Sequence, residues 1–152
     1  MERQLIAKKS IDIQAPVAKI WHVITSDESV AVFMLGMKPQ TDWKEGSPIT
    51  WIGRHEGEEH NMAKGFIQKL APNKTLQYSF FYGGYGHADV PEHYQTVVLE
   101  LESLNGEQSR LTAQQGDYSI FEDGETYVKH ADDFWTRAIL KIKELSEGSR
   151  GH

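Results

Sequence analysis

The sequence predicts an α+β fold in which a curved antiparallel sheet of about six to seven strands wraps around a long C-terminal helix. From Trp43 to Gln115, apolar side chains recur at every second position between turn signals, which is typical of consecutive hairpins. From about Glu125 to Ser146, the apolar positions recur instead at helical spacing. This helix is the only predicted element long enough to cover the apolar face of such a sheet.

Two short helices are expected between the first strand and the hairpins. The stretch from Leu5 to Ile13 alternates weakly, which predicts the first strand. Pro16 suits the start of a helix, since an N–H there would have no partner, and the apolar residues of 17–24 keep helical spacing. Residues 25–27 break this pattern and can cap a second helix over Glu28 to Phe33.

The hairpin region divides into strands at its turn signals. The clearest signals are a long glycine-rich loop, Gly83 to Pro91, and the dipeptide Asn105-Gly106. The predicted strands are 47–55, Asn61–Leu70, Leu76–Tyr82, Tyr94–Leu101 and 111–115. The second of these has two alternatives for its inward face, namely Met62, Phe66 and Leu70, or Ala63, Gly65 and Ile67.

Length and charge exclude several classes of protein. The 152 residues fit one domain, 1–152, that needs no metal or disulfide to fold. The 16 Lys+Arg against 22 Asp+Glu give a net charge of −6 without a basic cluster, which excludes nucleic-acid binding. Cysteine is absent, there is no secretion signal, and no apolar run approaches the roughly 18 residues needed for membrane insertion. We therefore expect a cytoplasmic protein.

Four segments, taken in order and spacing, resemble a known superfamily. They are Ile13–Trp21, residues 45–47, Gly65–Leu76 and Asp133–Leu140. These segments resemble the START-like helix-grip (SRPBCC) superfamily of lipid-transfer domains, birch-pollen-allergen-like proteins and polyketide cyclases, and within it the family of the activator of heat-shock-protein ATPase homologue. The resemblance runs from about Leu5 to Glu147. It implies a hydrophobic cavity between the sheet and the last helix, but no particular reaction.

Two positions depart from the family pattern. Phe33 stands where the family usually has tryptophan, and the loop Gly83 to Pro91 is longer than the resemblance leads us to expect. A longer loop there would reshape the mouth of the cavity.

Aromatic residues make up 11% of the chain and concentrate on the predicted inward face of the sheet and on the last helix. Some of them must form an ordinary packed core. However, a buried tyrosine hydroxyl needs a hydrogen-bond partner, and an apolar cavity with a few polar groups is the usual makeup of a small-molecule site. The candidate ligand-binding residues are Phe33, Trp51, His55, Met62, Phe66, Tyr78, Phe80, Tyr82, Gln115, Phe121 and Trp135.

We expect the protein to bind a hydrophobic or aromatic small molecule, without a cofactor and without catalysis. One alternative is a cyclase- or hydrolase-like enzyme in which His55 or His93 acts as the base. A second is a chaperone-regulating interaction module, as the resemblance implies, with a chaperone or a second copy of the chain as partner.

A metal site is a further interpretation of His55, together with His60. His55 and His60 flank three glutamates and could face each other across a hairpin turn to bind zinc or nickel. Their spacing does not match the helical His-Glu-x-x-His pattern. We therefore expect a solvated acidic turn and no metal.

Overall fold

Seven antiparallel strands form one sheet in the computed structural model, which describes residues 4–148 apart from the side chain of His55. The order is β1-β7-β6-β5-β4-β3-β2, so β2 to β7 each pair with their neighbours in sequence while β1 closes onto β7. The strands are β1 (Ala7–Ile13), β2 (Lys38–Gln40), β3 (Pro48–His55), β4 (Glu58–Ala71), β5 (Thr75–Tyr82), β6 (Gln95–Ser103) and β7 (Ser109–Gly116).

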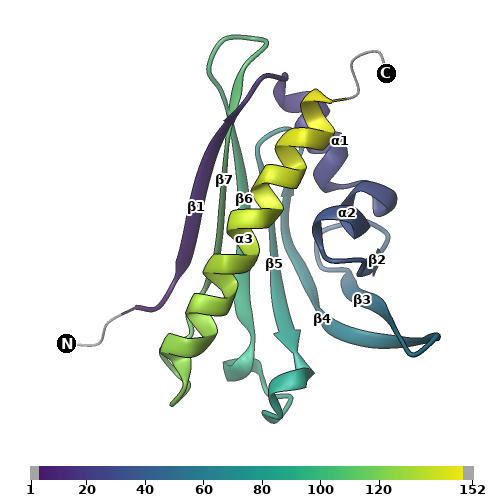
Figure 1. The fold of residues 1–152 in the computed structure, drawn as a ribbon, viewed down its shortest axis with the longest axis vertical. Coiled ribbons are helices and arrows are strands. Elements are labelled where there is room, and N and C mark those ends of the chain that lie inside the picture. Colours follow the sequence, from purple (N-terminus) through teal and green to yellow (C-terminus); the bar gives the residue numbers. More distant parts are fainter. Residues whose placement is uncertain (1–3, 149–152) are drawn as a thin grey trace.

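One long helix and two short ones pack on the same side of the sheet. The helices are α1 (Val17–Ile24), α2 (Asp27–Phe33) and α3 (Gly124–Glu147). Figure 1 shows α3 lying diagonally across the sheet, from the end that carries the β5–β6 loop to the end beside α1. The β5–β6 loop contains two short 3₁₀ turns, η1 (Gly83–Tyr85) and η2 (Pro91–His93). The predicted fold class, a curved sheet gripping a C-terminal helix, is therefore confirmed.

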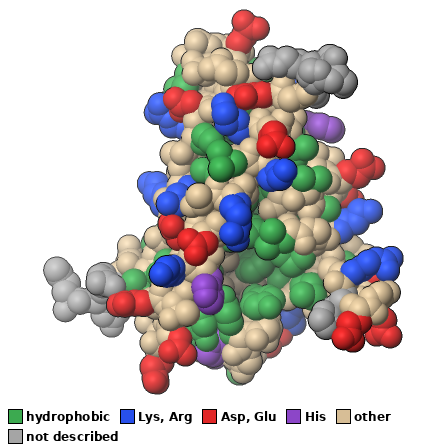
Figure 2. All heavy atoms as spheres, in the orientation of Figure 1, with side chains coloured by type: hydrophobic (Ala, Val, Ile, Leu, Met, Phe, Trp, Pro, Cys, Tyr) green, Lys and Arg blue, Asp and Glu red, His purple; other side chains and the backbone are tan. Residues whose placement is uncertain are grey.

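The face of the molecule that carries α3 has acidic and basic side chains interspersed along the helix (Figure 2). Apolar side chains gather in a hollow beside the N-terminal half of α3 (Figure 2). No helix within residues 4–148 has both the length and the apolar composition needed to cross a bilayer.

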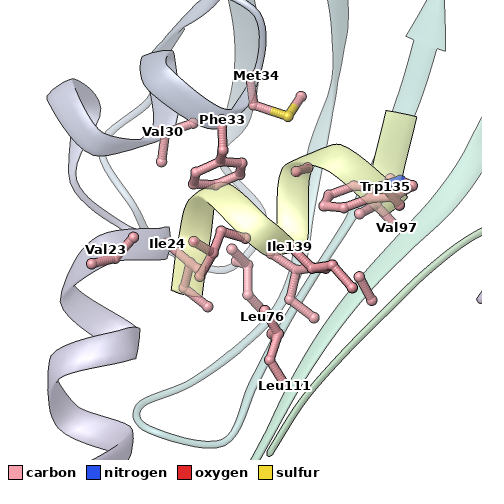
Figure 3. Packing of buried hydrophobic residues seen from close by; sticks show 14 of the residues in the cluster. Val23, Ile24, Val30, Phe33, Met34, Leu76, Val97, Leu111, Trp135 and Ile139 are labelled. Carbon is pink, nitrogen blue, oxygen red and sulfur yellow. The ribbon is translucent and has the colours of Figure 1, made fainter. Parts of the chain in front are cut away.

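The main core lies between the sheet and all three helices (Figure 3). Each fully buried side chain there contributes roughly 1.5–3 kcal/mol of transfer free energy. The sheet supplies Leu76, Val97 and Leu111, the short helices supply Ile24, Val30 and Phe33, and α3 supplies Trp135, Ile139 and Ile142. The alternation of apolar residues in the strands and their helical spacing in α3 produce this arrangement directly.

The structure decides the orientation of β4 that the sequence left open. Ala63 and Ile67 are buried in the core, whereas Phe66 is 53% exposed on the opposite face of the sheet. A Cβ atom on Gly65 would collide with the carbonyl oxygen of Ser79, so only glycine allows β4 and β5 to approach so closely here. At the adjacent irregularity in the pairing, the backbone N–H of Phe66 donates to Ser79 Oγ at 2.9 Å.

Strands β2 and β4 differ from the predicted elements, β2 in its presence and β4 in its length. Strand β2 was not expected, since its three residues are too few to show a period. Strand β4 spans Glu58–Ala71 rather than Asn61–Leu70, because its hairpin with β3 continues to a tight turn at Glu56 and Gly57, both with positive φ.

Candidate functional site

A cavity of about 210 Å³ lies between the sheet and the N-terminal half of α3. The hollow in Figure 2 lies on this side of the molecule. Strands β5, β6 and β7 supply one wall, α3 supplies another, and the segment after α2 supplies the third. The lining residues are Met34, Leu35, Met37, Tyr78, Phe80, Tyr82, Tyr85, Gln95, Val97, Gln115, Tyr118, His130, Ala131, Phe134 and Trp135.

Trp135 marks the point where the cavity meets the core. Its ring is 1% exposed, and the ring of Phe134 packs against it edge to face with centroids 4.9 Å apart. The indole Nε1–H of Trp135 donates to Gln115 Oε1 at 2.8 Å. An indole can only donate, so this bond fixes which end of the Gln115 amide faces the helix.

Two buried tyrosines contribute hydroxyl groups to the lining. Burial raises the pKa of Tyr78 well above its usual range. Burial also raises the pKa of Tyr118, while the hydrogen bond from Gln115 acts in the opposite direction and more weakly. Both hydroxyls therefore stay protonated and uncharged at physiological pH.

Among its described residues, the lining carries no carboxylate, ammonium or guanidinium group. Its titratable side chains are tyrosines and His130, an exposed residue of α3. The Nδ1 atom of His130 lies 3.3 Å from the hydroxyl oxygen of Tyr85. The site is thus an apolar, aromatic space in which the polar groups are uncharged.

A second aromatic cluster closes the end of the cavity near the β5–β6 loop. The ring of Tyr85 stacks on that of Tyr127 with centroids 4.0 Å apart. His87 Nε2 lies 2.9 Å from the Tyr127 hydroxyl, and the His87 ring stacks on Phe121 at 4.4 Å. These contacts attach the long glycine-rich loop to α3.

The structure brings together part of the predicted ligand-binding set. The predicted residues that line the cavity are Tyr78, Phe80, Tyr82, Gln115 and Trp135. Alternation along β5 and β7 and helical spacing in α3 point these side chains toward the same space.

The other predicted residues lie elsewhere. Phe33 belongs to the packed core, and Trp51 lies behind Tyr78 and Phe80, at centroid distances of 5.6 and 6.2 Å. Met62 is half-buried beside a separate groove at Lys64, and Phe66 lies on the opposite face of the sheet. Phe121 belongs to the second aromatic cluster.

Two of the histidines considered as bases or metal ligands, His60 and His93, lie outside the cavity lining. His93 lies outside that lining, and its Nδ1 donates to the carbonyl oxygen of Ala88 at 2.7 Å. The side chain of His55 lies outside the described residues. His60 lies on the exposed β3–β4 hairpin, where its Nε2 atom is 3.9 Å from Glu58 Oε1. Among the side chains that the structure describes, no group of three or more metal-ligating residues occurs.

Several lining residues were missed by the sequence reasoning. Met34, Leu35 and Met37 lie in the connection after α2, where Leu35 has a φ of 58°, so no periodicity marks them. Tyr85 and His130 come from the glycine-rich loop and the exposed side of α3. A sequence signal was available for Gln95 and Val97, which share the inward alternation of β6, and for Ala131, which lies on the buried side of α3.

Comparison with solved structures supports the same architecture. A protein from Cytophaga hutchinsonii, solved in solution, is 31% identical over 100% of both chains with a TM-score of 0.79. The Aha1 dimer from Colwellia psychrerythraea is 20% identical, with 96% of this chain and 98% of that one covered and a TM-score of 0.71. An HSP90 activator from Plasmodium falciparum is 14% identical, with 94% and 96% covered and a TM-score of 0.69.

A comparison with curated proteins gives no match. The family model described as Activator of Hsp90 ATPase homolog 1-like protein matches residues 14–147, a range that begins just after β1 and contains all three helices and strands β2 to β7. The match thus contains every lining residue of the cavity. The chain belongs to the Activator of Hsp90 ATPase homolog 1-like protein family.

Proposed function

We propose that this protein binds a hydrophobic or aromatic small molecule in the cavity between the sheet and α3. The observation that carries the proposal is the lining itself: aromatic and aliphatic side chains surround the space, and a few uncharged polar groups converge on it. This is the composition of small-molecule sites in general, where apolar walls supply affinity and polar groups orient the ligand.

The size of the cavity limits the ligand. About 210 Å³ is smaller than the roughly 300–1,000 Å³ typical of sites for drug-sized molecules. A ligand would therefore be small, or part of it would remain in the mouth beside Leu35, which is 68% exposed.

The proposal is binding without catalysis, because the lining offers no acid–base pair. His130 is the imidazole of the lining, and its neighbour at hydrogen-bonding distance is the hydroxyl of Tyr85 rather than a carboxylate. A general base is normally oriented by such a partner.

Two measurements test the proposal. Native mass spectrometry of the purified protein should show a bound mass that is lost on denaturation. The neutral dye N-phenylnaphthylamine should increase in fluorescence on binding, and Ala131→Leu, which fills the cavity from α3, should weaken this binding at least about tenfold.

Leu140→Phe is the matched control, since Leu140 is exposed on the same helix and lies outside the lining. This variant should bind the dye like the wild type. Circular dichroism confirms that both variants fold. Dye binding that Ala131→Leu leaves unchanged would refute the proposed location.

A chaperone-related role is the second candidate, and the comparisons favour it. The family is described as homologs of an activator of the Hsp90 ATPase, and one similar structure is that of an HSP90 activator. Val32 and Leu35 are 47% and 68% exposed in and after α2 and offer apolar surface for a partner. Purified Hsp90 should then hydrolyse ATP faster in the presence of this chain, and an unchanged ATPase rate would remove this candidate.

A homodimer is the other protein partner that the comparisons suggest, because one similar structure is an Aha1 dimer. Sedimentation equilibrium of the purified chain tests it directly. A mass that stays at one chain over the accessible concentrations would exclude the dimer.

A further inference from the structure

We infer that the ligand of this cavity is an uncharged aromatic molecule that carries a hydrogen-bond-accepting carbonyl oxygen. The inference rests on the proposed binding function and adds the chemical class of the ligand. Three features of the lining carry it: the absence of charged side chains among its described residues, the unpartnered hydroxyl of Tyr78, and the hydroxyl of Tyr118, whose proton also has no acceptor there.

The charge of the ligand follows from the lining. No Lys, Arg, Asp or Glu of the part of the chain that the structure describes contributes to it. A carboxylate or ammonium group that entered this space would lose its hydration without gaining a charged partner, which is unfavourable. His130 is no substitute, since it is exposed on α3 and its Nδ1 already lies beside the Tyr85 hydroxyl.

Tyr78 supplies the unpartnered hydroxyl. Its side chain lines the cavity from β5 and is 2% exposed, yet its hydroxyl has no hydrogen-bond partner among the described residues. Among the described residues, the polar side-chain atoms that are fully enclosed and lack a hydrogen-bond partner are Trp51 Nε1 and Ser146 Oγ. The Tyr78 hydroxyl is not among them, so it keeps some accessible surface, and the space that it can reach is the cavity.

Tyr118 supplies the second hydroxyl, next to the Gln115 amide that Trp135 orients. Trp135 Nε1–H donates to the amide oxygen of Gln115, which turns the amide nitrogen of Gln115 away from the helix. Gln115 lowers the pKa of Tyr118, which is the effect of an amide N–H directed at the hydroxyl oxygen. The Tyr118 hydroxyl lines the cavity and its proton has no acceptor among the described residues, so it remains available to a ligand.

Both hydroxyls keep their protons because burial raises the pKa of each tyrosine. The cavity therefore presents two O–H donors from Tyr78 and Tyr118. A pure hydrocarbon would cover these donors without pairing them, whereas a carbonyl oxygen accepts from them. The surrounding rings of Phe80, Phe134 and Trp135 favour an aromatic body next to that oxygen.

Gln95 adds an acceptor at the edge of the same space. Its amide nitrogen donates to the carbonyl oxygen of His93 at 3.0 Å, which leaves the amide oxygen for a ligand. A hydroxyl on the ligand would find its partner there, in addition to the carbonyl that the tyrosines require.

Three naphthalene derivatives of the same shape test the inference. Acetylnaphthalene carries a carbonyl, isopropenylnaphthalene replaces the carbonyl oxygen by a CH₂ group, and naphthoate replaces the methyl group by a charged oxygen. Isothermal titration calorimetry with the wild-type chain should show acetylnaphthalene binding about five- to tenfold more tightly than either of the others, the factor expected for one net hydrogen bond.

Tyrosine variants assign the preference to its donors. Tyr78→Phe combined with Tyr118→Phe should abolish the preference for acetylnaphthalene over isopropenylnaphthalene. Tyr94→Phe is the matched control, because its hydroxyl donates to Asp89 at 2.6 Å and it lies outside the lining, so the preference should persist.

The outcomes separate the inference from the proposed function. If N-phenylnaphthylamine binds but isopropenylnaphthalene or naphthoate equals or exceeds acetylnaphthalene, the inferred ligand class is wrong and the binding function stands. If neither the dye nor any of the three derivatives binds, the binding function itself is wrong. The comparison on the wild-type chain decides the inference even if the double variant does not fold.

Discussion

Trp135→Ala is expected to lower the free energy of unfolding by about 3–5 kcal/mol, as other core replacements of large aromatic rings do. The side chain is 1% exposed and lies where α3 crosses the sheet. Its removal opens a void and also leaves Gln115 Oε1 without its donor. An unpaired buried acceptor costs about 1–3 kcal/mol, but Gln115 lines the cavity, so water in the enlarged space can offset part of that cost.

Urea unfolding followed by far-ultraviolet circular dichroism is the appropriate measurement, because the variant lacks one of the fluorescent indoles. Leu140→Ala is the control on the same helix, where the side chain is 53% exposed. It should change the free energy of unfolding by less than about 1 kcal/mol. A loss below about 1 kcal/mol for Trp135→Ala would refute the conclusion that this ring holds α3 on the sheet.

Phenylalanine variants of the two buried tryptophans separate packing from hydrogen bonding. Trp51 and Trp135 are 2% and 1% exposed, so both lose a similar part of the indole ring. Trp135 Nε1 has an acceptor, whereas Trp51 Nε1 is buried without one among the described residues. Trp135→Phe should therefore cost at least about 1 kcal/mol more than Trp51→Phe, and the reverse order in urea unfolding would refute this reasoning.

Three further predictions concern the strands and the lining. Gly65→Ala should destabilise the fold by about 1–3 kcal/mol in urea unfolding, since the new methyl group would meet the backbone of β5. Gln115→Leu should cost about 1–3 kcal/mol in the same assay, because the indole N–H of Trp135 loses its acceptor. The folded-state pKa values of Tyr78 and Tyr118 are raised. Their contribution to stability is therefore complete below the unfolded tyrosine pKa of about 10 and is lost as the pH rises above it. Thermal unfolding should show a steeper alkaline loss for the wild type than for the double phenylalanine variant, and equal losses would contradict the shifts.

The part of the site that could be predicted comes from regular elements. The alternation of Tyr78 and Phe80 in β5 points both side chains inward, and helical spacing does the same for Trp135. Periodicity predicts which face of a strand or helix a side chain lies on, but not whether that side chain lines the cavity or belongs to the packed core. Trp51 shows this limit, because it is buried on the inward face and packs against Tyr78 and Phe80 but lies outside the cavity lining.

The residues that could not be predicted depend on irregular backbone. Leu35 reaches the cavity because it adopts a φ of 58° before Gly36 at 87°, and no repeating pattern encodes such a turn. The outward position of Phe66 goes with the inward position of Gly65, where the close backbone of Ser79 on the neighbouring strand leaves no room for a side chain. Both cases are set by tertiary geometry, which the local pattern of apolar residues does not contain.

The same spacing in α3 explains why the molecule has both a core and a cavity. Trp135, Ile139 and Ile142 fill the space under the C-terminal half of the helix. One turn before Trp135, the inward position holds Ala131, which lines the cavity opposite Val97 and Gln115 of the sheet. A methyl group at that position leaves unfilled space that a larger side chain would occupy. The cavity thus follows from side-chain volume at one helical position, which is why a single Ala131→Leu change is expected to close it while the core below Trp135 stays intact.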